Sequence, residues 1–287
     1  MSRHNKKLSI AIPSSVLEDT SNLRDKTVKI GLIARSCAIF GVSQIYVYRC
    51  SNSVNDTSLI RTLLEYINLP QYLRRSVYPK SSSLQYAGLL PPLKAPHHKS
   101  KVNSSEINIG DFRQGIVLSS DRTLLVDCGL KLPIESEGQS KKGEIVTIKF
   151  TSISPTLKAK IINDDDVNYY WGYNVTELSS INNLLTNTNS DLIISTSKKG
   201  TPFHNVWHNI TNKFQTSERI LIIYGSPRRG LLELFNTDNV SIFSDNHLLL
   251  NFIPNQNTET IRTEESIQFT LSIINFILHQ GIDDLVI

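Results

Sequence analysis

The strongest constraint on the fold is the order in which two kinds of sequence pattern follow one another along the chain. Residues 8–12 alternate as a short strand does, residues 24–40 are typical of a helix that Gly41 can end, and residues 43–49 form a second strand. Strand, helix, strand is the opening of a parallel α/β sheet. The same pattern returns after residue 190, so we predict one α/β domain built from both ends of the chain.

The middle of the chain has a different pattern. After a helix over residues 59–68, the prolines of residues 88–96 indicate a linker, and short strands separated by polar turns follow it. These strands are expected at residues 115–118, 123–127, 144–150 and 156–162. We therefore predict an inserted β-barrel or sandwich at residues 88–168, within an α/β domain made of residues 1–87 and 169–287.

The helices are expected from the spacing of their apolar residues. Pro202 suits the first position of one helix, and Thr263 can cap the last one, which has Glu264 and Glu265 in its first turn. The first helix is expected to make its apolar contacts through Val28, Leu32, Ile33, Ile39 and Phe40.

Composition and short motifs exclude several classes of protein. Hydrophobic residues make up 39% of the 287 residues and charged residues 20%, as in an ordinary folded chain. The three cysteines form no C-x-x-C pair, so we expect neither a disulfide framework nor a metal site, and a reducing cytoplasmic location fits. The chain start leads into no signal-peptide core, and no apolar run approaches the ~20 residues of a membrane span.

Basic residues gather in short clusters although the net charge is only +4. The clusters are Arg74, Arg75 and Lys80; Lys94, His97, His98, Lys99 and Lys101; Lys141 and Lys142; Lys198 and Lys199; and Arg228 and Arg229. Such clusters suit a polyphosphate partner, although solvated surface is the alternative for any single pair.

Three apolar strands in the C-terminal half are each followed by a loop of small and polar residues. The loops cover residues 195–200, 225–230 and 253–258. Ligands of a parallel sheet bind beyond the carboxyl ends of its strands, so the three loops can cradle one small ligand. The loop at 225–230 lacks G-x-x-x-x-G-K-[ST] and G-x-G-x-x-G, which disfavours a nucleotide triphosphatase and an ordinary dinucleotide fold. A tight turn with solvated arginines is the alternative for this loop.

No group of residues forms a recognisable nucleophile or metal site. The chain has no G-x-S-x-G elbow, and the adjacent His97 and His98 point in different directions. Residues 164–166 lack the glycine and glutamate spacing of a calcium loop and are expected to form a solvated turn. An α/β hydrolase or nucleotide enzyme with a β insert is therefore disfavoured.

Several stretches, in their order and spacing, resemble the SPOUT class of knotted RNA methyltransferases, in the archaeal and eukaryotic branch that carries an OB-like inserted domain. They are residues 29–40, 72–75, 88–93, 95–98, 170–173, 225–230 and 253–265. The resemblance implies an OB-like barrel at residues 88–168 that grips RNA, and a trefoil knot after residues 247–253. It also implies S-adenosylmethionine as the cofactor and a homodimer whose active site is shared between its subunits.

The resemblance assigns roles to particular residues. The candidates for cofactor binding, with the adenine among Ile253 and Ile261, are Thr196, Ser197, Gly200, Gly225, Ser226, Gly230, Ile253, Pro254, Asn255, Gln256, Thr258 and Ile261. The catalytic candidates are Arg35, Glu259, Arg262 and Glu264. The RNA-binding candidates are Arg74, Arg75, Lys99, Lys101, Lys141, Lys142, Arg228 and Arg229.

The catalytic candidates each have an alternative role. Arg35 contacts the RNA or is an arginine that snorkels among apolar neighbours. Glu259 and Glu264 position or deprotonate the target base, and Glu264 equally suits the start of a helix. Arg262 holds an RNA phosphate or the cofactor carboxylate.

We therefore predict an S-adenosylmethionine-dependent RNA methyltransferase that modifies a base, with uridine N3 in ribosomal RNA favoured. The alternative is a non-catalytic RNA-binding or ribosome-assembly protein that retains the fold. Either protein is expected to work without a membrane anchor and without a metal ion.

Overall fold

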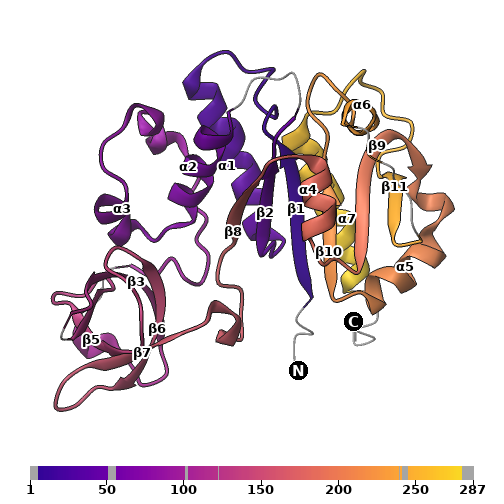
Figure 1. Ribbon diagram of the computed structural model, residues 1–287. Helices are drawn as coiled ribbons and strands as arrows, with labels where there is room; N and C mark the ends of the chain where they lie inside the picture. The colour runs from indigo at the N-terminus through magenta and orange to yellow at the C-terminus, as the bar shows by residue number, and fades with distance from the viewer. Residues whose placement is uncertain are drawn as a thin grey trace. The chain divides into compact units, whose positions relative to one another are not determined.

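The chain divides into two compact units in the computed structural model. The structure describes residues 6–50, 56–100, 103–121, 123–238, 240 and 245–279. The first unit consists of Met1–Glu65, Tyr86–Pro91 and Tyr173–Ile287, and the second of Tyr66–Gln85 and Pro92–Gly172 (Figure 1).

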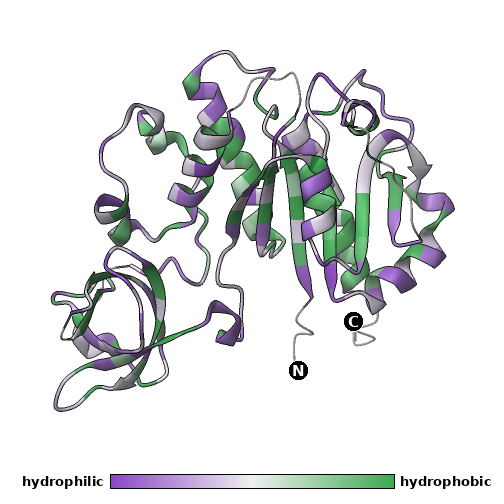
Figure 2. Cartoon of the chain, viewed as in Figure 1, coloured by the Kyte–Doolittle hydropathy of each residue, from purple (hydrophilic) through white to green (hydrophobic). Residues whose placement is uncertain are grey.

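The first unit is built on a parallel sheet with the strand order β11-β9-β10-β1-β2-β8. The strands are β1 (Lys7–Pro13), β2 (Gln44–Tyr48), β8 (Asn174–Leu178), β9 (Leu192–Pro202), β10 (Arg219–Ile223) and β11 (His247–Asn251). Figure 2 shows that hydrophobic residues are concentrated in this sheet. Its central strands are buried on both faces, which explains why their sequences are nearly continuous apolar runs.

Helices cover both faces of this sheet. They are α1 (Leu23–Ile39), α4 (Ile181–Asn187), α5 (Trp207–Thr216), α6 (Leu231–Thr237) and α7 (Thr263–Leu278), while α2 (Thr57–Asn68) runs from this unit into the second. Helices α4 and α6 share a core with Ala11, Leu221 and Ile223. Because successive strand residues point to opposite faces, the buried residues Ile10 and Ile222 lie on the other face of the sheet. Helices α1 and α7, which contact each other, lie on one side of the sheet (Figure 1).

The first helix buries a different face from the one expected. Asn22 is the N-cap of α1, and its side chain accepts a hydrogen bond from Asp25 N. Ile33 is buried, as predicted. Val28, Leu32 and Ile39, however, are 38%, 49% and 58% exposed, so within this chain they do not make the apolar contacts expected of them. The helix carries apolar residues on two faces, and the sequence spacing alone does not say which face the sheet covers.

Strand β9 runs through the first of the three predicted loops. Its ladder with β11 pairs Ser195 with Leu249 and then Thr201 with Leu250, so residues 196–200 bulge out between two paired segments. The strand continues to Pro202, a 3-10 turn follows at Phe203–Asn205, and the α-helix itself begins at Trp207 rather than at Pro202.

The second unit is a closed barrel with the strand order β3-β4-β5-β7-β6. Its strands are β3 (Phe112–Ser119), β4 (Leu124–Asp127), β5 (Ile134–Glu137), β6 (Ile145–Ser152) and β7 (Lys158–Ile162). Four of these lie where short strands were predicted, and β5 was missed because its sequence alternates isoleucine and serine with two glutamates. Val117, Val126, Ile148 and Phe150 fill the barrel core.

The second unit begins earlier in the sequence than the predicted insert at residues 88–168. Helix α3 (Gln71–Val77) packs on the barrel: Tyr72 Oη donates to Gln114 O at 2.7 Å, and Leu73 shares a small core with Ile116. Arg113, fully buried, lies over the Tyr72 ring at 4.9 Å. These contacts make residues 66–85 part of this compact unit.

His97 and His98 are structural residues of the second unit. Each places its Nε2 within hydrogen-bond distance of Asn68 O, at 2.8 Å and 2.7 Å. Burial lowers the pKa of His97 to about 3 and also lowers the pKa of His98. Within the described residues, no group of three or more His, Cys, Asp or Glu side chains is arranged to hold a metal ion, and no helix is long and apolar enough to cross a membrane.

Acidification from pH 7 to pH 5 is expected to lower the unfolding free energy by about 2 kcal/mol through His97 alone. The unfolded imidazole takes up its proton near pH 6.5, whereas the folded one stays neutral down to about pH 3, so stability is lost as the pH falls through this window. Urea denaturation at both pH values measures the loss. A His97→Asn variant should show a pH dependence about 2 kcal/mol smaller, and an unchanged dependence would contradict the assignment.

Candidate functional site

A cavity of about 290 Å³ lies in the first unit beside the bulge of β9 and beyond the carboxyl ends of β10 and β11. One wall is the β9 bulge at residues 196–199, a second is the loop at 225–230 between β10 and α6, and the third is the chain from residue 250 to residue 263. The structure thus brings the three predicted loops together at one edge of the sheet, where parallel α/β sheets bind ligands.

The lining of the cavity combines three kinds of side chain. The apolar ones are Leu231, Leu232, Leu250, Phe252, Ile253 and Ile261. The hydroxyl-bearing ones, besides the fully buried Tyr224, are Thr196, Ser197, Ser226, Thr260, Thr263, Ser266 and Thr270. The charged ones are Lys198, Lys199, Arg228, Glu233 and Glu259. A cavity that combines an apolar surface with many polar groups suits a small molecule that has both a flat apolar part and a polar part.

The β10–α6 loop is a tight turn that depends on Gly225. Ser226 and Arg229 exchange hydrogen bonds, from Ser226 N to Arg229 O at 3.0 Å and from Arg229 N to Ser226 Oγ at 3.0 Å. A Cβ atom at Gly225 would lie 2.9 Å from Leu231 N, so a larger residue cannot fit without moving the start of α6. The glycine is therefore required by the turn itself.

The chain after β11 is tied to the β9 bulge. Asn251 donates from Nδ2 to Lys198 O at 3.0 Å, and Lys198 Nζ donates to Glu259 O at 3.2 Å. Thr263 Oγ1 donates to Gly225 O at 3.3 Å, which joins the start of α7 to the end of β10. The three walls are therefore connected to one another by hydrogen bonds.

Most of the predicted cofactor-binding residues line the cavity. Those that do are Thr196, Ser197, Gly225, Ser226, Gly230, Ile253, Gln256 and Ile261. Pro254, Asn255, Thr258 and Gly200 are not among the lining residues. Asn255 instead adopts a left-handed backbone conformation, with φ 59°, in the turn that follows β11.

Gly200 has a different role from the predicted one. A Cβ atom there would lie 2.7 to 2.9 Å from three backbone atoms of Leu250. The close approach that demands glycine is thus between strands β9 and β11, where the bulge closes, and not between backbone and ligand.

The catalytic candidates do not come together. Glu259 lines the cavity, whereas Arg35, Arg262 and Glu264 do not. Arg35 is half-buried on α1, and Arg262 is exposed at the N-cap of α7, where its backbone N donates to Glu265 Oε2 at 3.0 Å. Thr263, the expected cap, is the first residue of that helix.

Glu264 is buried on the side of α7 away from the cavity lining. It is 8% exposed, and its Oε2 lies 3.3 Å from Lys29 Nζ on α1. The same ammonium group lies 2.6 Å from Asp19 Oδ1 in the loop after β1. Glu264 is therefore placed to hold the helix rather than to reach a substrate in the cavity.

The RNA-binding candidates also separate. Lys141, Lys142 and Arg75 are exposed on the second unit, Lys99 is half-buried, and Lys101 lies outside the described residues. Arg74 uses its guanidinium to hydrogen bond Leu69 O at 2.9 Å and Ile67 O at 3.0 Å, at the end of α2. In the first unit, Arg228 is exposed at the cavity, whereas Arg229 Nη2 lies 3.8 Å from Glu18 Oε1. Arg74 and Arg229 thus have structural partners.

Sequence reasoning missed the hydroxyl side of the cavity. Thr263, Ser266 and Thr270 line it from α7, and their spacing of three and four residues places them on one face of the helix. The sequence shows that spacing, but the apolar residues Ile267, Leu271 and Ile274 on the same helix give a stronger pattern and were the ones recognised.

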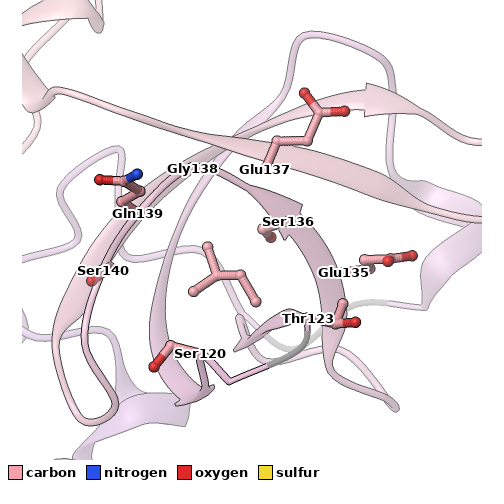
Figure 3. Close-up of a pocket in the computed structure, with 9 residues that line it drawn as sticks. Ser120, Thr123, Glu135, Ser136, Glu137, Gly138, Gln139 and Ser140 are labelled. Atoms are coloured by element: carbon pink, nitrogen blue, oxygen red, sulfur yellow. The ribbon is translucent and has the colours of Figure 1, made fainter.

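A second, open cavity lies on the barrel. It is lined by Ser120, Thr123, Leu124, Glu135, Ser136, Glu137, Gly138, Gln139 and Ser140 (Figure 3). The charged groups among these described residues are the two glutamates, which repel phosphate groups. This part of the barrel is therefore unsuited to the RNA backbone.

Comparison with known proteins identifies the family. A family model described as "Putative RNA methyltransferase" matches residues 7–274. The chain is 28% identical to an uncharacterised protein of Haloarcula marismortui, with 92% of this chain and 97% of that one covered. It is 29% identical to the human 28S rRNA (uridine-N(3))-methyltransferase, with 92% and 77% covered, and 28% identical to the mouse enzyme, with 92% and 75% covered. The chain thus belongs to this family of RNA methyltransferases.

Proposed function

We propose that the protein uses S-adenosylmethionine to methylate N3 of a uridine in ribosomal RNA. The observation that carries the proposal is the cavity formed by the β9 bulge and the loops beyond β10 and β11, in a chain whose family is one of RNA methyltransferases. The target atom and the ribosomal substrate are those in the names of the human and mouse relatives.

The residues of the cavity fit this cofactor. Ile253 and Ile261 offer apolar contacts to an adenine ring, and Thr260 and Ser266 offer hydroxyl groups to the polar part of the molecule. Tyr224, which is fully buried, and Thr270 both line the cavity and interact with each other through their hydroxyl groups. Bound S-adenosylmethionine supplies a methyl group already activated on a sulfonium.

The chain's own residues then have to bind the uridine, exclude water and accept the proton that leaves N3. Two carboxylates line the cavity, Glu233 on α6 and Glu259 in the segment between β11 and α7, and we assign the last of these roles to Glu259. Arg228, exposed at the rim, is placed to contact an RNA phosphate. Glu264 is not assigned a role in proton transfer, because its carboxylate is paired with Lys29.

Two experiments test the proposal. Calorimetry should show S-adenosylmethionine binding to the purified protein, and an absence of binding at millimolar cofactor would favour a non-catalytic RNA-binding or ribosome-assembly protein. Mapping of modified nucleotides in total RNA, from cells with and without the gene, should reveal one lost N3-methyluridine in ribosomal RNA. A lost methyl group in another RNA or on another atom would correct the substrate.

We further propose that the barrel is an OB-like domain that grips RNA through Lys141 and Lys142, which are both exposed in the turn before β6. A Lys141→Glu, Lys142→Glu double variant is expected to weaken RNA binding at least tenfold at moderate salt, because both phosphate contacts become repulsive. S-adenosylmethionine affinity should not change. A control double variant, Lys158→Glu with Lys160→Glu, makes the same charge change on β7. Equal loss in both variants would mean that net charge, rather than this turn, controls binding.

We also propose that the protein is a homodimer. Exposed apolar side chains on the two contacting helices α1 and α7 support it, since Leu32, Ile39 and Phe276 are 49%, 58% and 61% exposed, and a partner subunit would remove them from water. Sedimentation equilibrium should then give twice the chain mass of 32.3 kDa. The trefoil knot and the cytoplasmic location stay predictions, which a chain trace from an experimental structure and cell fractionation would test.

A further inference from the structure

Lys29 is a buried cation with acidic partners from two distant segments. Its side chain is 5% exposed, and its ammonium lies 2.6 Å from Asp19 Oδ1 and 3.3 Å from Glu264 Oε2. Burial alone would raise the pKa of Asp19, but the hydrogen bond and the charge of Lys29 outweigh it and lower that pKa. An ammonium so far from water must keep such partners, which makes this cluster resistant to rearrangement.

One partner of Lys29, Glu264, belongs to a helix turn that contributes other residues to the cavity lining. Glu264 is the second residue of α7, and its neighbours Thr263 and Ser266 line the cavity on the other side of the same turn. Because Lys29 on α1 holds the Glu264 carboxylate, it also fixes the position and rotation of the first turn of α7, which carries these two hydroxyl groups.

The other partner belongs to a loop that supports a second wall. Asp19 lies in the loop after β1, next to Glu18, whose Oε1 is 3.8 Å from Arg229 Nη2. Arg229 closes the tight turn of the β10–α6 loop through its hydrogen bonds with Ser226. The loop after β1 itself contributes no lining residue, yet it contacts both the start of α7, through Lys29, and the β10–α6 loop.

We propose that Lys29 is a positioning residue for the cofactor site: its ammonium clamps Glu264 against Asp19 and so holds the first turn of α7 in the geometry that binds S-adenosylmethionine. The inference rests on the proposed function of the cavity. A site whose supporting side chains are locked in place binds its ligand without having to order them first, and loss of the lock weakens binding.

The test is the affinity for S-adenosylmethionine, measured by calorimetry, beside the turnover at saturating cofactor. Lys29→Met is expected to weaken cofactor binding about tenfold, because it leaves the Glu264 carboxylate buried without its cation and the first turn of α7 without its anchor. Turnover at saturating S-adenosylmethionine should stay within about twofold, and Lys29→Arg should recover part of the affinity because it restores the charge.

A matched control lies on the same helix. Lys26 Nζ is 2.8 Å from Asp56 Oδ2, in an ion pair that involves no residue of the cavity lining. Lys26→Met also removes one ion pair of α1, but it should leave cofactor affinity unchanged. Equal losses in the Lys26 and Lys29 variants would show a general weakening of α1 and overturn the inference.

Glu264→Gln provides a second variant if Lys29→Met does not fold. It keeps the shape of the side chain and the Lys29–Asp19 pair, and it should weaken S-adenosylmethionine binding while turnover at saturation is preserved. Unchanged S-adenosylmethionine affinity in this variant would overturn the inference. Lower turnover with a changed pH profile would also overturn it, since Glu264 would then act on the uridine base itself. If the unaltered protein binds no S-adenosylmethionine, the proposed function fails and not this inference alone.

Discussion

Replacing Gly200 by alanine is expected to lower the unfolding free energy by about 3 kcal/mol. A Cβ atom would lie 2.7 to 2.9 Å from the backbone of Leu250, and backbone atoms cannot turn aside as a side chain can. Strand β9 would therefore have to separate from β11 where the bulge closes. Urea denaturation at pH 7 measures the change.

The same variant should also lose cofactor affinity. Leu250, Asn251 and Phe252 line the cavity directly after the contact with Gly200, so a shift of β11 changes its wall. Gly230→Ala is the control, because a Cβ atom there meets no other atom within 4 Å. Its stability should change by less than about 0.5 kcal/mol. If Gly200→Ala were as stable as Gly230→Ala, the assignment of Gly200 to strand contact would be wrong.

Replacing Ile261 by aspartate is expected to weaken S-adenosylmethionine binding about a hundredfold. The side chain lines the cavity beside Ile253 and Phe252, and a carboxylate there must be desolvated when an adenine ring covers it. Calorimetry gives the affinity directly and does not depend on the identity of the RNA.

The stability of the Ile261→Asp variant should change little, because Ile261 is only partly buried in a segment without regular secondary structure. Ile109→Asp is a suitable control, since Ile109 is 63% exposed in the second unit. It introduces the same charge and should leave cofactor affinity unchanged. An affinity within twofold of the unaltered protein for Ile261→Asp would place the adenine elsewhere in the cavity.

Local patterns predicted most of the secondary structure. The apolar runs of β10 and β11, the turn at Gly41 with φ 72° and four of the five barrel strands all follow from residue type and spacing. Predictions that needed a partner segment were less accurate. Strand β5 has few apolar residues and forms because β4 and β7 pair with it on either side.

The candidate site shows the same division. The loops of the cavity could be found because glycine, serine and asparagine after a strand indicate a turn wherever they occur. The sequence could not predict the roles of four other residues, because each role depends on a partner that only the fold brings into contact. Gly200 meets Leu250, Arg74 binds the end of α2, Arg229 lies near Glu18, and Glu264 pairs with Lys29.

The sequence by itself determined the alternation of strands and helices, the change of pattern that marks the inserted barrel, and the three polar loops that follow apolar strands. These depend on backbone preferences and on the period of apolar residues, which are local properties. Only the tertiary structure decided that residues 196–199 reach the cavity as a bulge within β9, and that Glu264 is paired with Lys29 instead of facing that cavity. The physical reason is that sheet order and helix rotation bring distant residues together. The role of a buried charged side chain then depends on which oppositely charged groups lie beside it.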